Sequence, residues 1–229
     1  MKSTHLLAVV VSLSALIPSY AQDPVFTNWT TFIPSTSTAA GDGTALGTIT
    51  FGGDVVAVSY SGEVRQGNDT TTTVSDDSSK FYSTPGFSTP ADFTPPLLLS
   101  DLIANDGGDN LHTILFGEPV VDPRMHIASL GDPTTSISWT FSSPFSLLSS
   151  NSLLTVSPGN ILNGVEGFGT IQFIGTFSQI SWSSEEIEET AGFQVGAQGI
   201  AVPETNTASL LLLSFGLCVR RNRRDSAFR

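Results

Sequence analysis

The stretch Ser136-Ile137-Ser138-Trp139-Thr140-Phe141 alternates hydroxyl and apolar side chains. Because successive side chains of a β-strand point to opposite faces, Ile137, Trp139 and Phe141 would share one face. The pattern predicts a half-buried strand. Similar short runs, bounded by Gly, Pro, Asn, Asp or Ser, occupy residues 48–51, 55–60, 111–116, 125–130, 170–177, 179–182 and 193–197.

Regular short strands with polar outer faces predict an all-β fold, in which two antiparallel sheets pack as a jelly-roll-like or related sandwich. The apolar positions change phase between Phe177 and Ile180, which indicates a bulge or a tight turn. Residues 84–96 hold four prolines and predict a long surface loop. We expect one extracytoplasmic domain over residues 22–198, and helices only in the two terminal signals.

The amino terminus has the parts of a cleavable signal peptide over residues 1–21. Lys2 supplies the positive charge, residues 6–17 are mostly apolar, and Ser19-Tyr20-Ala21 places small residues where signal peptidase reads them. Cleavage between Ala21 and Gln22 is therefore expected. An uncleaved anchor is the alternative, although the apolar run is shorter than the roughly 20 residues of a membrane span.

The carboxyl terminus has three successive parts. A linker at residues 199–207 contains Val202-Pro203-Glu204, an uncharged apolar segment follows at residues 208–219, and the basic tail at residues 220–229 begins with Arg220, Arg221, Arg223 and Arg224. Arginines stay on the cytoplasmic side of membrane segments, so the tail would remain inside and the domain outside. Even extended back to residue 205, the apolar segment makes about 22 Å of helix, short for a permanent anchor. Either the arginines reach the interface or the tail is held only briefly.

These last residues resemble the PEP-CTERM signal of Gram-negative bacteria, which implies recognition and cleavage by an exosortase, a membrane-embedded cysteine transpeptidase. The family's second proline is Thr205 here. The pentapeptide at residues 202–206 also resembles a sortase motif of the Leu-Pro-x-Thr-Gly type, with Val for Leu and Asn for Gly. Residues 114–141 loosely resemble the bodies of PEP-CTERM cargo proteins, a likeness that implies fold more than chemistry.

The charge of the expected mature body is strongly negative. Residues 22–202 hold three basic and nineteen acidic residues, a net charge of −16, against −12 for the whole chain. Such a charge opposes binding to nucleic acid or anionic lipid and favours divalent cations or a hydrated polysaccharide. The single cysteine, Cys218, lies in the apolar tail, so the body has no disulfide and no thiol nucleophile.

Candidate metal ligands are few, and each has a plain structural explanation. Asp101, Asp106 and Asp109 offer oxygen atoms of the kind that Ca²⁺ binds, without the EF-hand spacing, and a solvated turn explains them equally well. The acidic run at residues 185–189 is typical of a solvated loop and could also contribute to a cation site. We expect no resident cofactor, with Ca²⁺ as the one candidate.

Candidate catalytic residues are equally sparse. His112 and His126 are the two histidines of the body, and we interpret both as ordinary strand residues. Glu166 is a candidate for one of the two carboxylates that glycoside hydrolysis needs, whereas Asn163-Gly164 before it suits a hairpin turn. Trp139 and Trp182 share faces with apolar residues and are expected in the core, whereas Trp29 would stack on a sugar if exposed.

The sequence therefore favours an exported, non-catalytic protein of the cell surface or extracellular matrix. The expected partners are signal peptidase, an exosortase-type enzyme, transiently the membrane, and an extracellular polysaccharide, with no nucleic acid. Three alternatives stay open: a carbohydrate-active enzyme, a Ca²⁺-dependent glycan-binding protein and a sortase substrate.

Overall fold

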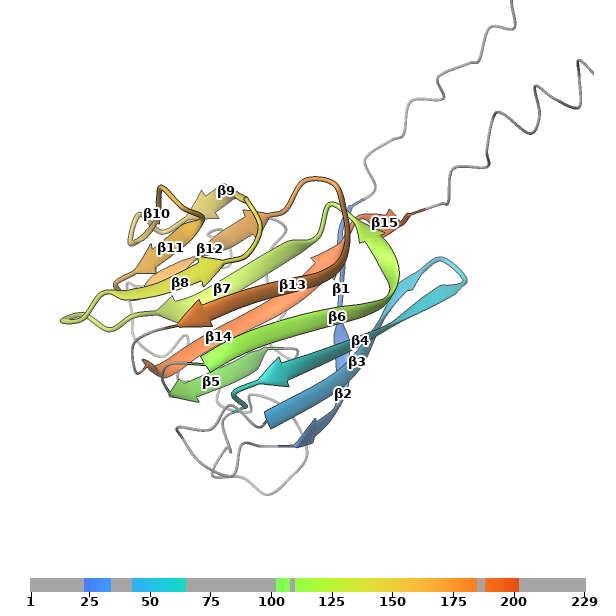
Figure 1. Ribbon diagram of the computed structural model, residues 1–229, viewed down its shortest axis with the longest axis horizontal. Coiled ribbons are helices and arrows are strands. Elements are labelled where there is room, and N and C mark those ends of the chain that lie inside the picture. The colour runs from blue at the N-terminus through green and yellow to red at the C-terminus, as the bar shows by residue number, and fades with distance from the viewer. Residues whose placement is uncertain (1–22, 34–42, 65–101, 108–109, 185–187, 202–229) are drawn as a thin grey trace, which may run out of the picture.

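The structure is a computed structural model that describes residues 23–33, 43–64, 102–107, 110–184 and 188–201. Every regular element in these ranges is a β-strand, and the strands form two antiparallel sheets (Figure 1). The predicted all-β sandwich is thereby confirmed. The expected signal-peptide helix at residues 1–21 and the apolar helix at residues 208–219 lie outside the described residues, as do residues 84–96.

The smaller sheet has six strands. Its order is β1 (Val25–Phe26), β14 (Glu188–Ala197), β7 (Arg124–Leu130), β12 (Gly167–Gln172) and β9 (Ser146–Ser150), and β5 (Ile103–Gly107) pairs with another part of β14. The central strand β7 is almost fully buried, and β14 and β12 pair with its two edges.

The larger sheet has nine strands. Its order is β10 (Leu154–Ser157), β11 (Ile161–Gly164), β8 (Ile137–Phe141), β13 (Thr176–Ser184), β6 (Asn110–Val121), β4 (Asp54–Gly62), β3 (Gly43–Phe51) and β2 (Asn28–Ile33), with β15 (Gly199–Ile200) paired to β6. In β3, buried and more exposed residues alternate along the whole strand. The outward residues of this sheet are therefore a separate set from its core residues.

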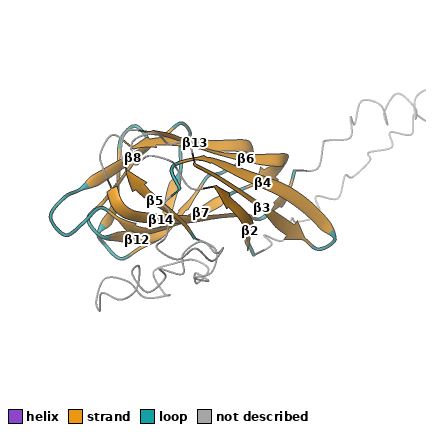
Figure 2. Cartoon of the chain, turned by 90° about the horizontal axis from the view of Figure 1, so that it is seen from below, coloured by secondary structure: helices purple, strands orange, loops and turns teal. Residues whose placement is uncertain are grey.

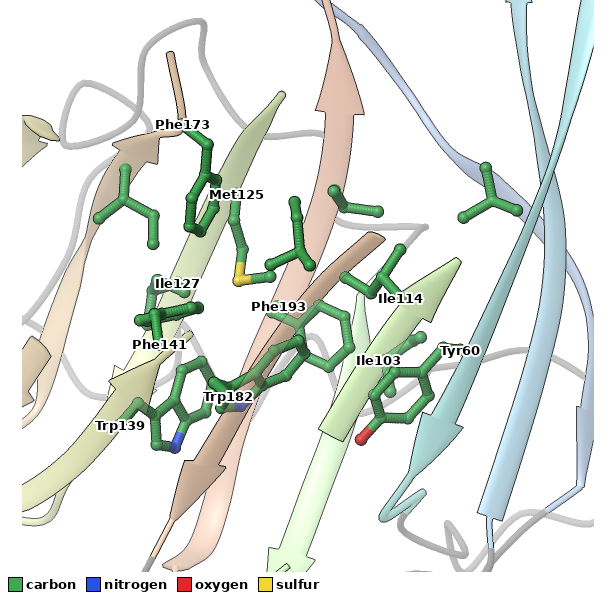
Figure 3. Close-up of a cluster of buried hydrophobic side chains, with 14 of the residues drawn as sticks. Tyr60, Ile103, Ile114, Met125, Ile127, Trp139, Phe141, Phe173, Trp182 and Phe193 are labelled. Atoms are coloured by element: carbon green, nitrogen blue, oxygen red, sulfur yellow. The ribbon is translucent and has the colours of Figure 1, made fainter. Parts of the chain in front are cut away.

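The hydrophobic core lies between the sheets (Figures 2 and 3). Trp139 and Trp182 of the larger sheet lie with ring centroids 5.5 Å apart, and Phe193 of the smaller sheet meets Trp182 edge-on at 5.1 Å. Both tryptophans are 1% exposed, which confirms their predicted place in the core. Trp29 is also buried, so its ring is closed to a stacked sugar.

A two-residue turn of glycines connects β3 and β4 as a hairpin. Phe51 pairs with Asp54, which leaves a two-residue turn of Gly52 and Gly53. Gly52 has φ +62°, a conformation that glycine adopts without the steric cost of a Cβ atom. The runs predicted at residues 48–51 and 55–60 are thus the two arms of one hairpin.

The run at residues 170–177 is two strands rather than the single strand predicted. Its first residues end β12 in the smaller sheet, and Thr176 begins β13 in the larger sheet. Phe173, in the crossing between them, is fully buried. Because the crossing keeps an apolar side chain in the shared core, the period of two continues through it and hides the break.

The predicted irregularity after Phe177 is confirmed. Phe177 pairs with Val120 of β6, whereas Gln179 pairs with Leu115, so the register changes between them. The extra residues are on β6, where Gly117 and Pro119 interrupt the regular pattern. The bulge lets one long strand β6 pair with β4 at one end and β15 at the other.

Three further segments differ from what their sequence predicts. Asn163 and Gly164 belong to β11 and pair with Thr155 and Leu154, so the predicted hairpin turn is wrong. The backbone of residues 188–189 belongs to β14 rather than to a loop. Residues 199–200, the start of the expected linker, form β15.

Candidate functional site

The two body histidines lie in different sheets, and both are buried. His112 is on β6 of the larger sheet and His126 is on β7 of the smaller sheet. They are 1% and 0% exposed, respectively. Both are strand residues, as the sequence predicts, and each is held by a different set of neighbours.

His112 is part of an aromatic stack in the larger sheet. Its ring lies nearly parallel to the ring of Trp182 at 5.0 Å, and its Nδ1 atom is 2.8 Å from the hydroxyl of Tyr60. The Tyr60 hydroxyl also donates to the backbone carbonyl of Glu63 at 2.8 Å. Since a hydroxyl has one hydrogen, Nδ1 of His112 must be the donor in the other bond, which assigns the neutral Nδ1–H tautomer.

Burial shifts the pKa values of His112 and Tyr60 so that both side chains favour their neutral forms. Burial lowers the pKa of His112 to about 4. Burial, with the nearby carboxylate of Glu63, raises the pKa of Tyr60 well above its ordinary value. Both side chains are therefore uncharged at neutral pH.

His126 is packed against Phe26 and Thr170. The imidazole stacks on the ring of Phe26 at 4.2 Å, and its Nδ1 atom is 2.9 Å from the Thr170 hydroxyl. Burial and then the positive charge of Arg124 lower the pKa of His126 to about 3. This histidine thus joins β1, β7 and β12 of the smaller sheet as a neutral polar group.

Glu166 is in the connection between β11 and β12, where its carboxylate accepts a hydrogen bond from the Ser129 hydroxyl at 2.7 Å. Its backbone carbonyl accepts another from the Asn151 amide at 2.9 Å. Glu166 and Ser129 both have φ +56°, in the left-handed region that residues other than glycine seldom adopt. The sequence indicated Glu166 through its glycine-rich surroundings, but no pattern indicated Ser129 or Asn151.

The contacts of Glu166 can be compared with those of the two catalytic carboxylates of a glycosidase. A glycosidase places a second carboxylate across the scissile bond, whereas the Glu166 carboxylate is bonded to a serine hydroxyl. Ser129 follows Ala128 at an irregularity where Leu130 pairs with Gly167 and Ile127 with Gly169. The bond between Ser129 and Glu166 therefore spans a β-bulge and holds its two strands together.

The described residues contain no group of three or more His, Cys, Asp or Glu side chains placed to hold a metal ion. Asp106 belongs to the backbone of β5, whereas Asp101, Asp109 and residues 185–187 lie outside the described residues. The Ca²⁺ site at residues 101–110 thus stays a prediction.

A set of outward side chains in the larger sheet is uncharged, and we call the surface that it forms the outer face. It consists of three rows across neighbouring strands: Gln179, Leu115, Ser59, Leu46 and Thr31; Ser181, Thr113, Ser61, Thr44 and Ile33; and Leu111, Ser183, Thr140 and Ile161. Hydroxyl groups predominate, and none of these residues is charged. Sequence reasoning missed this surface because a row is defined by the pairing of strands far apart in the chain.

The predicted sorting residues lie beyond the described part of the chain. They are Ala21 and Gln22 at the signal-peptide cleavage point, Val202, Pro203 and Glu204 in the sorting motif, and Arg220, Arg221, Arg223 and Arg224 in the membrane stop. Within the described residues, the structure has no helix with the length and apolar character needed to cross a membrane.

Comparison with known proteins identifies no relative. No family model matches the chain. No curated protein matches it. No solved structure matches it.

Proposed function

We propose that the chain is an exported, non-catalytic β-sandwich protein of the cell surface or extracellular matrix. The observation that supports this best is the contrast between its buried and exposed polar groups. The histidines that would serve as acid or base are neutral and buried in separate sheets, whereas the three rows of the outer face contain no charged residue. Such an arrangement suits a protein that contacts its surroundings through a surface rather than through a reaction centre.

In this proposal, the two terminal segments direct the export and processing of the protein. Signal peptidase removes residues 1–21, and the apolar segment with Arg220 to Arg224 holds the precursor in the inner membrane. An exosortase-type enzyme then cleaves near Val202-Pro203-Glu204 and releases the acidic body. The short apolar segment supports a temporary hold, because it is shorter than the hydrocarbon core of a bilayer.

Mass spectrometry of the surface and extracellular fractions tests this route. A carboxyl terminus near Glu204 is expected, together with loss of residues 220–229. A mature protein that keeps Arg220 to Arg229 would overturn the cleavage and leave a stable anchor in its place.

Two single variants separate the exosortase and sortase alternatives. Position 204 is variable in a Leu-Pro-x-Thr-Gly motif and is part of the Val-Pro-Glu core. Thr205 matches the sortase motif, whereas it already departs from the second proline of the PEP-CTERM motif. We therefore expect Glu204→Ala to leave the tail attached and Thr205→Ala to be processed normally. The reverse result would identify a sortase substrate, and Thr207→Ala is the matched control outside both motifs.

A further inference from the structure

The outer face of the larger sheet combines exposed hydroxyl groups with exposed aliphatic side chains. Leu111 and Leu115 are 69% and 47% exposed on β6, and Thr113 lies between them on the same face. On the neighbouring strands, Leu115 pairs with Ser59, and Ser59 pairs with Leu46. Figure 2 shows β13, β6 and β4 in one layer and β14, β7 and β12 in the other, so this face points away from the core.

The charge distribution restricts what this face can bind. The expected mature body has a net charge of −16, yet the outer face has no acidic or basic residue. A polyanion would be repelled by the body as a whole. A polycation would bind to carboxylates elsewhere on the protein, because the outer face has no carboxylate. The occupant that fits the outer face is electrically neutral.

The side chains also favour a carbohydrate over another protein. Protein interfaces are enriched in Tyr, Trp, Phe, Met and Arg and depleted in Ser. The outer face has none of the enriched types and is dominated by Ser and Thr. Hydroxyl and amide groups such as those of Thr113, Ser59 and Gln179 can exchange hydrogen bonds with sugar hydroxyls, and Leu111 and Leu115 can cover the C–H faces of the rings. Neighbouring strands lie about 4.8 Å apart, so each row offers repeated contacts to an extended chain.

We propose that the outer face binds an extended, neutral polysaccharide across β13, β6, β4 and β3. This rests on the proposed function only in placing the protein outside the cell, where such polymers occur. Binding is shallow and spread over several rows, because the contacts come from a sheet surface. It needs no metal ion and no titrating group, since every contributing side chain is uncharged.

Affinity electrophoresis of the exported protein, recovered from the producing cells, tests the proposal. The gels contain hydroxyethyl cellulose or dextran as neutral probes and alginate as a polyanionic probe. Retardation by at least one neutral polymer, with none by alginate, is expected. Retardation equal in alginate, or absent with both neutral polymers, would overturn the proposal.

Two matched variants locate the site. Leu111→Glu adds a charge to the outer face, and Ile174→Glu adds the same charge to an equally exposed aliphatic position, 72% exposed, in the connection between β12 and β13. We expect Leu111→Glu to weaken the apparent affinity about tenfold, which corresponds to about 1.4 kcal/mol, and Ile174→Glu to leave it unchanged. Leu115→Glu should repeat the effect of Leu111→Glu, and circular dichroism confirms that each variant is folded.

Equal losses in Leu111→Glu and Ile174→Glu would overturn the site. Concentration-dependent self-association that Leu111→Glu abolishes, seen by sedimentation without polysaccharide, would instead identify the face as a contact between copies of this chain. The intact mass of the same sample reports the fate of the tail separately. A protein that is cleaved near Glu204 but not retarded contradicts the binding site alone, and one that is retarded with its tail intact contradicts the cleavage alone.

Discussion

The hydroxyl of Tyr60 lies 2.8 Å from Nδ1 of His112, although the two residues are 52 positions apart in the chain. The pairing of Tyr60 with Ile114, two residues beyond His112 on β6, sets this contact. One hydroxyl thus joins the imidazole to the end of β4 through the carbonyl of Glu63. This polar link inside an aromatic core makes the stability of the protein depend on pH and on the residues that surround the link.

The free energy of unfolding should fall as the pH decreases from about 6.5 to about 4. The folded-state pKa values of His112 and His126 are lowered to about 4 and about 3, whereas an unfolded histidine titrates near 6.5. Between these values the unfolded chain binds protons that the folded chain does not, so acid favours unfolding. Over this pH interval the loss is on the order of 3 kcal/mol for each histidine.

Chemical denaturation at a series of pH values from 7.5 to 4.5 measures this loss. The variant His112→Gln removes one of the two titrating groups, so its stability should depend on pH about half as steeply in this range. Equal free energies of unfolding for the unmodified chain at pH 7 and pH 5 would contradict the lowered folded-state pKa values of the two histidines.

Gly62→Ala should destabilise the fold strongly. An added Cβ at Gly62 would lie 2.6 Å from the Tyr60 hydroxyl oxygen and 2.8 Å from Nδ1 of His112, and Gly62 has φ +153°. In Tyr60→Phe the first of these contacts disappears, so the double variant should lose less stability than the sum of the two single losses. Gly53→Ala is the control, because nothing lies within 4 Å of its added Cβ. Strictly additive losses in thermal or chemical unfolding would argue against this crowding at Gly62.

Ser129→Ala should cost more stability than Ser129→Gly. Both variants lose the 2.7 Å hydrogen bond to Glu166, but glycine adopts the φ of +56° without the strain that alanine keeps. The difference should be about 1 kcal/mol, the usual cost of a left-handed conformation for a residue with a Cβ atom. Chemical denaturation of the two variants gives the comparison directly, and a more stable alanine variant would contradict the observed backbone conformation.

Glu166 should be dispensable for any reaction on polysaccharides. Its carboxylate is used by the Ser129 hydroxyl in a bond that closes a β-bulge. Incubation of the unmodified protein and of Glu166→Gln with neutral polysaccharides should release no reducing ends from either. Product release by the unmodified protein that disappears in Glu166→Gln, with the fold intact, would establish the carbohydrate-active enzyme instead.

Alternation in the sequence predicted strands in which one face is buried and the other is polar. Ile137, Trp139 and Phe141 alternate because β8 lies within the larger sheet with solvent on one side. The strands β9 and β10 were missed because they lie at sheet edges, where apolar residues such as Val156 stay exposed and the contrast between faces is lost. Alternation therefore indicates a strand with one buried face, and it is a weaker signal in an edge strand whose residues are mostly exposed.

The candidate sites were less predictable than the strands. Ser129 and Glu166 are 37 positions apart and meet only because β7 and β12 pair in one particular register. The outer face likewise depends on the registers of β13, β6, β4 and β3. A period of two assigns residues to a face, but it does not say which residues of other strands become their neighbours.

The pairing of β1 with β14, close to the start of β15, gives the domain a single point of attachment. Val25 of β1 pairs with Ala197, and Ile200 of β15 follows three residues later, so the chain enters and leaves the sandwich at the same end (Figure 1). Proteins with adjacent termini tolerate circular permutation and insertion into other chains. The sandwich could thus be grafted into a surface loop of a carrier protein as a closed unit, with both junctions side by side and the opposite end projecting outward.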